Sequence, residues 1–370
     1  MITVSLCLIV KNEADRLDNC LKSVAEAVDE IIIVDTGSTD ETKEIARRYT
    51  DKVYDFTWCD DFSAARNESF RYATKDYILW LDADDILKSE DCKKLQTLKE
   101  SLQEHIDVVY FIYNYAFDET GKPTLTFKRE RLVKRSTNPK WVGFIHEYID
   151  IHGNALESDI AVTHTRVHGN ADRNLNIYKK KIAEGIELNA RDQYYYGKEL
   201  YYHGKFEEAI EVLEKFVTLP IWIEDELDAN NRLAECYIWK KENRKARECI
   251  YRNLERTVPR AESLFQLARA FQQEGRYQDA AYWYEAILHR EKPTNVAGFL
   301  YDEYWTWKPH IELCVCYYYL GAIDKAIEQN ELAAEYVPNN DAVLSNRQFF
   351  SNLNKNNDIN SNVTPEDYEE

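Results

Sequence analysis

The chain has 370 residues, a formal net charge of −19 at pH 7, and 31% charged residues. A chain of this length can bury two separate cores, and its acidic balance argues against a protein that binds nucleic acid or an anionic membrane through general electrostatic attraction. The eight cysteines form neither a CxxC pair nor a Cys/His cluster with zinc spacing, and no segment is long and apolar enough to span a membrane, so we expect a soluble, cytoplasmic protein with reduced thiols.

The first part of the chain alternates strand and helix patterns. Apolar runs predict strands and amphipathic spacing predicts helices, in the order strand 3–10, helix 15–28, strand 30–34, a helix ending at 49, strand 52–56, helix 63–73 and strand 77–81. This order is typical of a doubly wound, mostly parallel α/β sheet. Ligands of such sheets bind beyond the carboxyl ends of the strands.

Acidic residues follow these strand ends, and the densest group is residues 82–85. Alternation along an extended chain places Asp82 and Asp84 on one face and Asp85 on the other. Two neighbouring carboxylates repel each other unless a cation lies between them, and hard ions such as Mg²⁺ or Mn²⁺ take oxygen ligands. The sequence therefore predicts a metal site here. The alternative is a solvated acidic turn that caps the next helix.

Four stretches in this order resemble the family 2 glycosyltransferases of the GT-A fold: VSLCLIVKNE, IIIVDTGSTDET, WCDDFSAARNESF and DYILWLDADD. The resemblance is close over about the first 90 residues and looser to residue 170, which implies a GT-A domain at 1–170. It also implies inverting transfer of a sugar from a nucleotide-diphosphate donor, a UDP-sugar, with Mg²⁺ or Mn²⁺ as cofactor.

The same resemblance implies roles for individual residues. Asp35 contacts the base of the nucleotide, and Arg66 contacts the nucleotide or its diphosphate. Asp82 binds the ribose or the metal, and Asp84 is the metal ligand of a DxD motif. Further residues at the strand ends complete the donor site, namely Val10, Asn12, Glu13 and Ala83.

Local alternatives stay open for three of these residues. Asp35 precedes Gly37 and could form an Asx-turn. Glu13 could accept from nearby backbone amides, and Arg66 could form a routine ion pair with Asp60 or Asp61.

Residues 108–113 and 125–133 predict two more strands joined by a turn at 118–123. The second strand carries a group of bases that could attract a diphosphate or form a solvated strand edge: Lys128, Arg129, Arg131, Lys134 and Arg135.

The stretch KWVGFIHE, residues 140–147, resembles the WxGxxHE sequence of the glycosyltransferases that modify bacteriocin peptides, of the sublancin type. An inverting transfer needs a base near the acceptor, for which Glu147 is the first candidate and Asp150 the second. His146, His164 and His168 are candidate metal ligands or diphosphate contacts, and the alternative for each is a structural histidine.

From residue 171 the chain becomes helical and repetitive. Small residues recur in one register, and four alanines mark it: Ala209, Ala246, Ala280 and Ala326. Their spacings of 37, 34 and 46 place an insertion in the last junction, within 295–308. The pattern resembles tetratricopeptide repeats, which present a concave face that commonly binds polypeptide. We expect this all-α domain at 171–351 and a disordered polar and acidic tail at 352–370.

Together these features predict an inverting, metal-dependent glycosyltransferase whose acceptor is a Cys, Ser or Thr side chain of a peptide or protein. One alternative is a saccharide or lipid-linked acceptor of the cell envelope. Another is a repeat scaffold that carries an inactive transferase domain. The repeats could also pair two chains as a homodimer.

Overall fold

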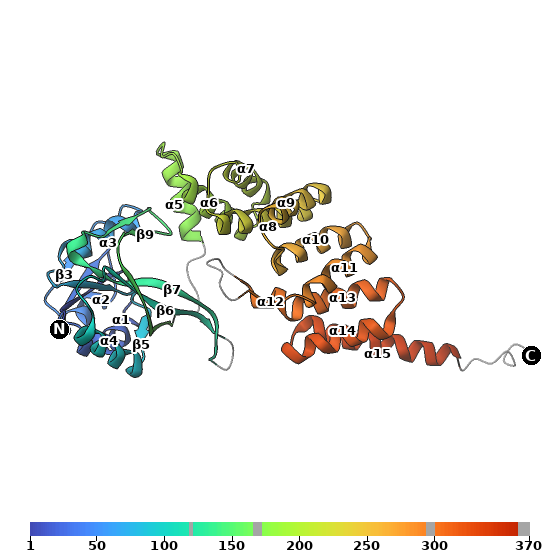
Figure 1. Ribbon diagram of the computed structural model, residues 1–370, viewed down its shortest axis with the longest axis horizontal. Coiled ribbons are helices and arrows are strands. Elements are labelled where there is room, and N and C mark those ends of the chain that lie inside the picture. Colours follow the sequence, from blue (N-terminus) through green and yellow to red (C-terminus); the bar gives the residue numbers. More distant parts are fainter. Residues whose placement is uncertain (118–120, 166–171, 294–299, 362–370) are drawn as a thin grey trace, which may run out of the picture. The chain divides into compact units, whose positions relative to one another are not determined.

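The computed structural model describes residues 1–117, 121–165, 172–293 and 300–361 (Figure 1). The chain forms two compact units, Met1–Glu184 and Gly185–Glu370. The sequence predicted the boundary at 170/171, and the difference is helix α5 (Asp172–Ala183), which packs its Tyr178 ring against Phe144 of the first unit. Among the described residues, every helix is too short or too polar to cross a membrane.

The first unit is built on an eight-stranded, mostly parallel sheet with the order β3-β2-β1-β4-β7-β6-β10-β5. Its strands are β1 (Val4–Val10), β2 (Glu30–Asp35), β3 (Val53–Asp55), β4 (Tyr77–Trp80), β5 (Asp85–Leu87), β6 (Val108–Phe117), β7 (Pro123–Lys134) and β10 (Ala155–His164). A separate hairpin joins β8 (Lys140–Val142) to β9 (Tyr148–Asp150). The helices of this unit are α1 (Leu17–Val24), α2 (Thr42–Ala46), α3 (Phe62–Arg71) and α4 (Ser89–Ser101), besides α5 and two short 3₁₀ turns at Ala25–Ala27 and Arg135–Thr137.

Apolar side chains cover both faces of this sheet, as expected for continuous hydrophobic strands. Leu6 and Leu8 of β1 face the core that contains Leu17 and Leu21 of α1. Cys7, between them, faces the opposite core with aromatic residues of α3, β4 and β8. Because both faces are filled, the carboxyl-end edge is where polar side chains can gather.

The parallel strands β1, β2 and β4 confirm the predicted doubly wound pattern. Antiparallel pairs extend this parallel sheet. In them β7 pairs with β4 and with β6, and β5 pairs with β10. The sequence predicted β6 and β7 but not β5, α4 or β10, because their apolar residues are few and interrupted by charge. Part of the expected turn at 118–123 lies outside the described residues.

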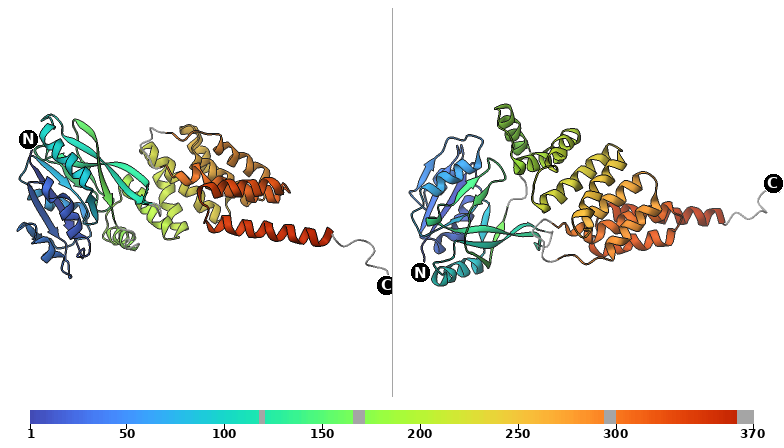
Figure 2. Two further views of the ribbon diagram at one scale, coloured as in Figure 1. Left: turned by 90° about the horizontal axis from the view of Figure 1, so that it is seen from below. Right: turned by 45° about the horizontal axis from the view of Figure 1, so that its top comes forward.

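The second unit stacks helices in antiparallel pairs (Figure 2). They are α6 (Ala190–Tyr202), α7 (Phe206–Phe216), α8 (Ile223–Trp239), α9 (Asn243–Arg256), α10 (Ala261–Gln273), α11 (Tyr277–Leu288), α12 (Asp302–Trp305), α13 (Trp307–Tyr319), α14 (Ile323–Tyr336) and α15 (Asp341–Ser361). The four register alanines are all fully buried. At the turn of each pair stands a residue with positive φ, in three cases a glycine and in one case Lys241 with φ 61°.

Helix α15 continues to Ser361, past residue 352 where the sequence predicted a disordered tail to begin. Residues 362–370 lie outside the described part of the chain.

Candidate functional site

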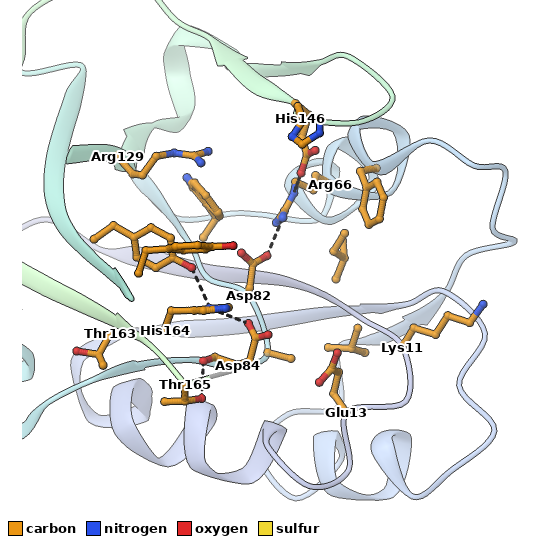
Figure 3. Close-up of a pocket in the computed structure, with 18 of the residues that line it drawn as sticks. Lys11, Glu13, Arg66, Asp82, Asp84, Arg129, His146, Thr163, His164 and Thr165 are labelled. Carbon is orange, nitrogen blue, oxygen red and sulfur yellow. Dashed lines mark hydrogen bonds and ion pairs between the residues drawn. The ribbon is translucent and has the colours of Figure 1, made fainter. Parts of the chain in front are cut away.

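A pocket of about 1040 Å³ opens at the carboxyl ends of β1 and β4 in the first unit (Figure 3). It is also lined by residues of α3, β6, β7, the loop before β9, the end of β10 and the start of α5. The structure brings nine of the predicted site residues into its lining, namely Val10, Glu13, Arg66, Asp82, Ala83, Asp84, His146, Glu147 and His164. Asn12, Asp35 and Asp150 are not among the described lining residues. His168 lies outside the described residues.

Asp84 and His164 face each other at the base of the pocket (Figure 3). His164 Nδ1 lies 3.5 Å from Asp84 Oδ1 and 3.5 Å from Asp85 Oδ1. Thr165 fixes the backbone of this turn, because its N–H and its hydroxyl both donate to the Asp84 carbonyl at 2.8 and 2.6 Å. Burial lowers the pKa of His164, but its hydrogen bond with Asp85 and the nearby carboxylate charges outweigh burial and raise it.

Asp85 is part of the scaffold beneath this pair. Its side chain is fully buried and lies 3.0 Å from the equally buried Arg131 guanidinium. The Tyr113 hydroxyl donates to Asp85 Oδ1 at 2.9 Å, and the Asp82 N–H donates to Oδ2 at 3.1 Å. The Arg131 guanidinium also stacks between the rings of Trp80 and Tyr113, 3.9 and 4.4 Å from their centroids. Asp85 thus holds the acidic turn in place.

This environment corrects the expectation for Arg131, which the sequence placed on a solvated strand edge or near a diphosphate. The side chain is fully buried. It occupies an inward-facing position of β7, where an unpaired charge would be costly and Asp85 compensates it.

The donor set fits a divalent cation. One ligand atom each of Asp84, Asp85 and His164 lie within 4.8 Å of one another. Because Asp85 is committed to Arg131 and Tyr113, Asp84 and His164 are the residues that would hold the ion. Carboxylate oxygen suits Mg²⁺ and Mn²⁺, and the imidazole nitrogen favours the transition metal of the two.

Asp82, predicted to bind the ribose or the metal, forms an ion pair with Arg66 and is not in the group of Asp84, Asp85 and His164. Arg66 NH2 is 2.6 Å from Asp82 Oδ1, and Arg66 Nε donates to Glu147 Oε1 at 2.6 Å. Burial raises the pKa of Asp82, but the charges of Arg66 and Arg131 outweigh it and hold the pKa at about 2. The Arg66 guanidinium lies 5.0 and 4.8 Å from the ring centroids of Trp80 and Trp141, and its side chain is only 10% exposed.

Helix α3 positions the loop that carries Glu147. Asn67 holds Trp141 from both sides, donating to its carbonyl and accepting from its N–H, each at 2.9 Å. The Phe62 N–H donates to the Phe144 carbonyl at 2.9 Å. Together with the Arg66 ion pair, these contacts place Glu147 on the pocket wall.

His146, a candidate metal ligand or diphosphate contact, and Asp150, the second candidate base, lie differently. His146, with φ 51°, lines the pocket beside Arg66, and Asp82 lies between it and Asp84 in Figure 3. It is therefore outside the group of Asp84, Asp85 and His164. Asp150 has a side chain 55% exposed and lies 3.2 Å from His152 Nε2. Of the two candidate bases, Glu147 lines the pocket, whereas Asp150 is not among its described lining residues.

Asp35 combines the two interpretations that the sequence left open. Its Oδ1 accepts from the N–H groups of Gly37 and Ser38, both at 2.9 Å, which is an Asx-turn. Its Oδ2 is buried without a hydrogen-bond partner among the described residues. An unsatisfied buried oxygen is costly, so it suits a ligand that donates a hydrogen bond. Asn12 ties the adjoining loops together, because its N–H donates to Ser38 Oγ and its side chain accepts from the Thr39 N–H.

Sequence reasoning missed Tyr113, Asn67 and Thr165 as parts of the site. Each acts on a residue at least 28 positions away in the chain, so no local pattern marks it. The sequence signal for Arg131 was an arginine at a position where strand alternation predicts an apolar residue.

The chain was compared with protein families and with known proteins. Residues 5–160 match the family described as Glycosyl transferase family 2, and residues 240–296 match a tetratricopeptide repeat family. The chain is 29% identical over 227 residues to the SPbeta prophage-derived glycosyltransferase SunS of Bacillus subtilis, which covers 58% of this chain and 53% of that protein. It is 50% identical over 97 residues to a TPR repeat-containing protein of Synechococcus elongatus, which covers 26% of this chain and 24% of that protein.

The chain therefore spans about half or less of the length of these relatives. Among solved structures, it resembles glucosyl-3-phosphoglycerate synthase from Mycobacterium tuberculosis at a TM-score of 0.35 and 15% identity, over 51% of this chain and 81% of that one. At that score the likeness adds nothing about this site.

Proposed function

Because the chain carries a family 2 glycosyltransferase domain followed by tetratricopeptide repeats, we propose that it is an inverting glycosyltransferase that uses a nucleotide-diphosphate sugar, a UDP-sugar. The observation that carries the proposal is the pocket that Asp84, His164, Asp82, Arg66 and Glu147 line together. In it Asp84 and His164 face each other (Figure 3). Carboxylates, an imidazole and a buried guanidinium around one cavity suit a diphosphate and its counter-ion.

On the donor side, Asp84 and His164 would hold a Mn²⁺ or Mg²⁺ ion, which would neutralise the charge of the leaving diphosphate. Asp35 accepts from an N–H of the base through its buried Oδ2. Asp82, whose carboxylate stays 35% exposed despite its ion pair, remains able to accept from a ribose hydroxyl. Arg66 keeps Asp82 ionised and oriented.

On the acceptor side, Glu147 takes the proton of the attacking hydroxyl or thiol. The acceptor oxygen or sulfur forms its bond to the anomeric carbon from the face opposite the diphosphate, while the bond from that carbon to the diphosphate oxygen breaks. The sugar is thereby transferred with inversion, and the nucleoside diphosphate leaves. A general base of this kind contributes roughly 10²–10⁴-fold to the rate.

The acceptor we propose is a Cys, Ser or Thr side chain of a peptide or protein. Two features support this acceptor. One is the KWVGFIHE stretch, residues 140–147, which carries Glu147. The other is the repeat unit, since tetratricopeptide repeats offer a surface of the kind that binds polypeptide. A cytoplasmic location and a homodimer formed through the repeats are part of the same proposal.

The test is to incubate the full chain with a panel of nucleotide sugars and Mn²⁺ and to measure release of the nucleoside diphosphate. We expect hydrolysis of one UDP-sugar, slow without an acceptor and abolished by chelator. Adding peptide and saccharide acceptors separately then distinguishes a polypeptide acceptor from a cell-envelope acceptor. No release from any donor would contradict the proposal and favour an inactive transferase domain on a repeat scaffold.

A further inference from the structure

The repeat unit contains a segment that the other repeats lack. The connection between α11 and α13 is longer than the connections between the earlier helix pairs. We call residues 300–306, the described part of this longer connection, the strap. It includes the four-residue helix α12 and packs against α10 and α13 (Figure 1). The preceding junctions bring α6 against α8 and α8 against α10 directly.

The strap is anchored on one buried carboxylate. The Tyr301 N–H and the Trp305 indole N–H both donate to Glu262 Oε1, at 2.9 and 3.1 Å. Glu262 lies on α10 and is only 7% exposed, and its Oε2 is buried without a hydrogen-bond partner among the described residues. A carboxylate in this position has capacity for a further donor that the strap does not supply.

The side chains of the strap lie on aromatic and cationic groups of the first helix in each pair. The Tyr301 hydroxyl accepts from Arg232 of α8 at 3.3 Å, and the Tyr304 ring packs edge-on against Phe265 of α10 at 4.9 Å. Arg232 in turn lies over the Tyr201 ring of α6, 5.0 Å from its centroid. The surface under the strap is therefore continuous from α6 to α10.

Charged and polar side chains link neighbouring helices across this surface. Lys198 of α6 lies 3.2 Å from Asp228 of α8, and Gln266 of α10 donates to Glu235 of α8 at 2.6 Å. We call the surface made by Lys198, Asp228, Arg232, Glu235, Glu262 and Gln266 the inner belt. Lys198 pairs with Asp228 across helices, and Arg232 lies 3.5 Å from Asp228 and 3.6 Å from Glu235 on its own helix, so these charges keep partners when the surface is uncovered.

We propose that the inner belt is a binding surface for a polypeptide segment with aromatic residues four positions apart, and that the strap occupies it within the same chain as a displaceable stand-in. The strap shows the chemistry that the surface takes, namely N–H donors for Glu262 and a phenol beside Arg232. A helix of four residues has little stability of its own, so its position depends on these exchangeable contacts. This inference does not depend on the transferase activity.

The first test uses hydrogen exchange on the full chain. If the strap is displaceable, the backbone amides of Tyr301 and Trp305 should exchange at least ten-fold faster than those of residues 264–270 in α10, because the strap opens without unfolding the repeats. Equal exchange rates would show that the strap opens only with the whole unit, and would overturn the proposal.

The second test measures binding of a labelled peptide with the sequence of residues 300–306. The variant Tyr301→Ala/Trp305→Ala should bind this peptide at least ten-fold more tightly than the unaltered chain. It should not bind a peptide in which the residues equivalent to Tyr301 and Trp305 are alanine. The matched control is Tyr251→Ala/Tyr336→Ala, which removes two exposed aromatic side chains from α9 and α14. This control should bind as the unaltered chain does.

Circular dichroism must first show that the Tyr301→Ala/Trp305→Ala variant keeps its helices. If the variant loses them, the hydrogen-exchange experiment alone tests the proposal. A folded strap variant that binds no more tightly, or that binds both peptides alike, would overturn the proposal. Light scattering tests whether a second copy of the chain supplies the strap. If the unaltered chain is a dimer and the Tyr301→Ala/Trp305→Ala variant is a monomer, the strap binds the partner chain. That result would overturn the proposal that the strap occupies the inner belt of its own chain.

Discussion

Replacing Arg131 by methionine should destabilise the first unit while leaving the pocket residues themselves unchanged. Arg131 and Asp85 are both fully buried and lie 3.0 Å apart. The substitution keeps an unbranched apolar stem between the rings of Trp80 and Tyr113 but leaves the Asp85 carboxylate without its cation. Asp85 would retain the Tyr113 hydroxyl, the Asp82 N–H and the nearby His164 imidazole, but no permanent cation.

Removing one partner of a buried ion pair costs about 3–5 kcal/mol. No reduction for solvent screening applies, because neither side chain is exposed. The double variant Arg131→Met/Asp85→Leu should recover most of the loss, since apolar replacement of a whole buried pair is often near neutral. Arg129→Met is the matched control: its side chain is 29% exposed and 3.6 Å from Glu130, so the expected loss is about 0–1 kcal/mol.

The assay is urea unfolding at pH 7, followed by tryptophan fluorescence of Trp80 and its neighbours. The order of stability should be unaltered chain, then Arg129→Met, then Arg131→Met, with the double variant above the single one. A loss below about 1 kcal/mol for Arg131→Met, or one equal to the control, would refute the view that this pair supports the acidic turn.

Three further substitutions test other parts of the structure. Asp35→Asn keeps an oxygen for the N–H groups of Gly37 and Ser38 but removes the charge, so calorimetry should show UDP binding weaker by about 1.5–3 kcal/mol. Unchanged affinity would show that the uracil ring does not bind at Asp35. Glu147→Gln should lower the transfer rate by roughly 10²-fold or more at similar UDP affinity, and a wild-type rate would exclude it as the base. Burial raises the pKa of Asp225 to about 6 from an ordinary 3.8, so the folded chain holds a proton between those values that the unfolded chain has released, and stability falls as pH rises through this window. Asp225→Asn should therefore add about 1 kcal/mol at pH 7, after allowance for partial exposure, and nothing below pH ~4; an equal gain at both pH values in urea unfolding would contradict this.

The parallel strands could be predicted from the sequence because their apolar runs are continuous. The predicted strand 77–81 and the observed β4, Tyr77–Trp80, differ by one residue at the end. Strand β10 could not be predicted in the same way. Its buried residues, Ile160, Val162 and Thr163, all lie in its second half, and its first half carries the exposed Glu157 and Asp159. The pairing that orders it with β6 and β5 is set by the tertiary structure.

The acidic turn shows the same limit at the site. Its carboxylates and their place at a strand end could be read from the chain, but their division of roles could not. Asp85 became structural because Arg131 reaches it from β7, and Asp82 forms an ion pair with Arg66 of α3. Both partners are set by strand order and helix position. In the repeats, by contrast, each contact lies between neighbouring units, so the register of small residues was enough to predict the helix pairs.

The most direct measurement compares nucleoside diphosphate release by the unaltered chain and by Asp84→Asn, with one UDP-sugar, in Mn²⁺ and in excess chelator. Asp84→Asn preserves the size of the side chain and the Asp84 carbonyl that Thr165 holds, so the fold should persist in circular dichroism. Release should occur only with the unaltered chain in Mn²⁺. Equal release by Asp84→Asn, or release that persists in chelator, would contradict a metal-dependent glycosyltransferase.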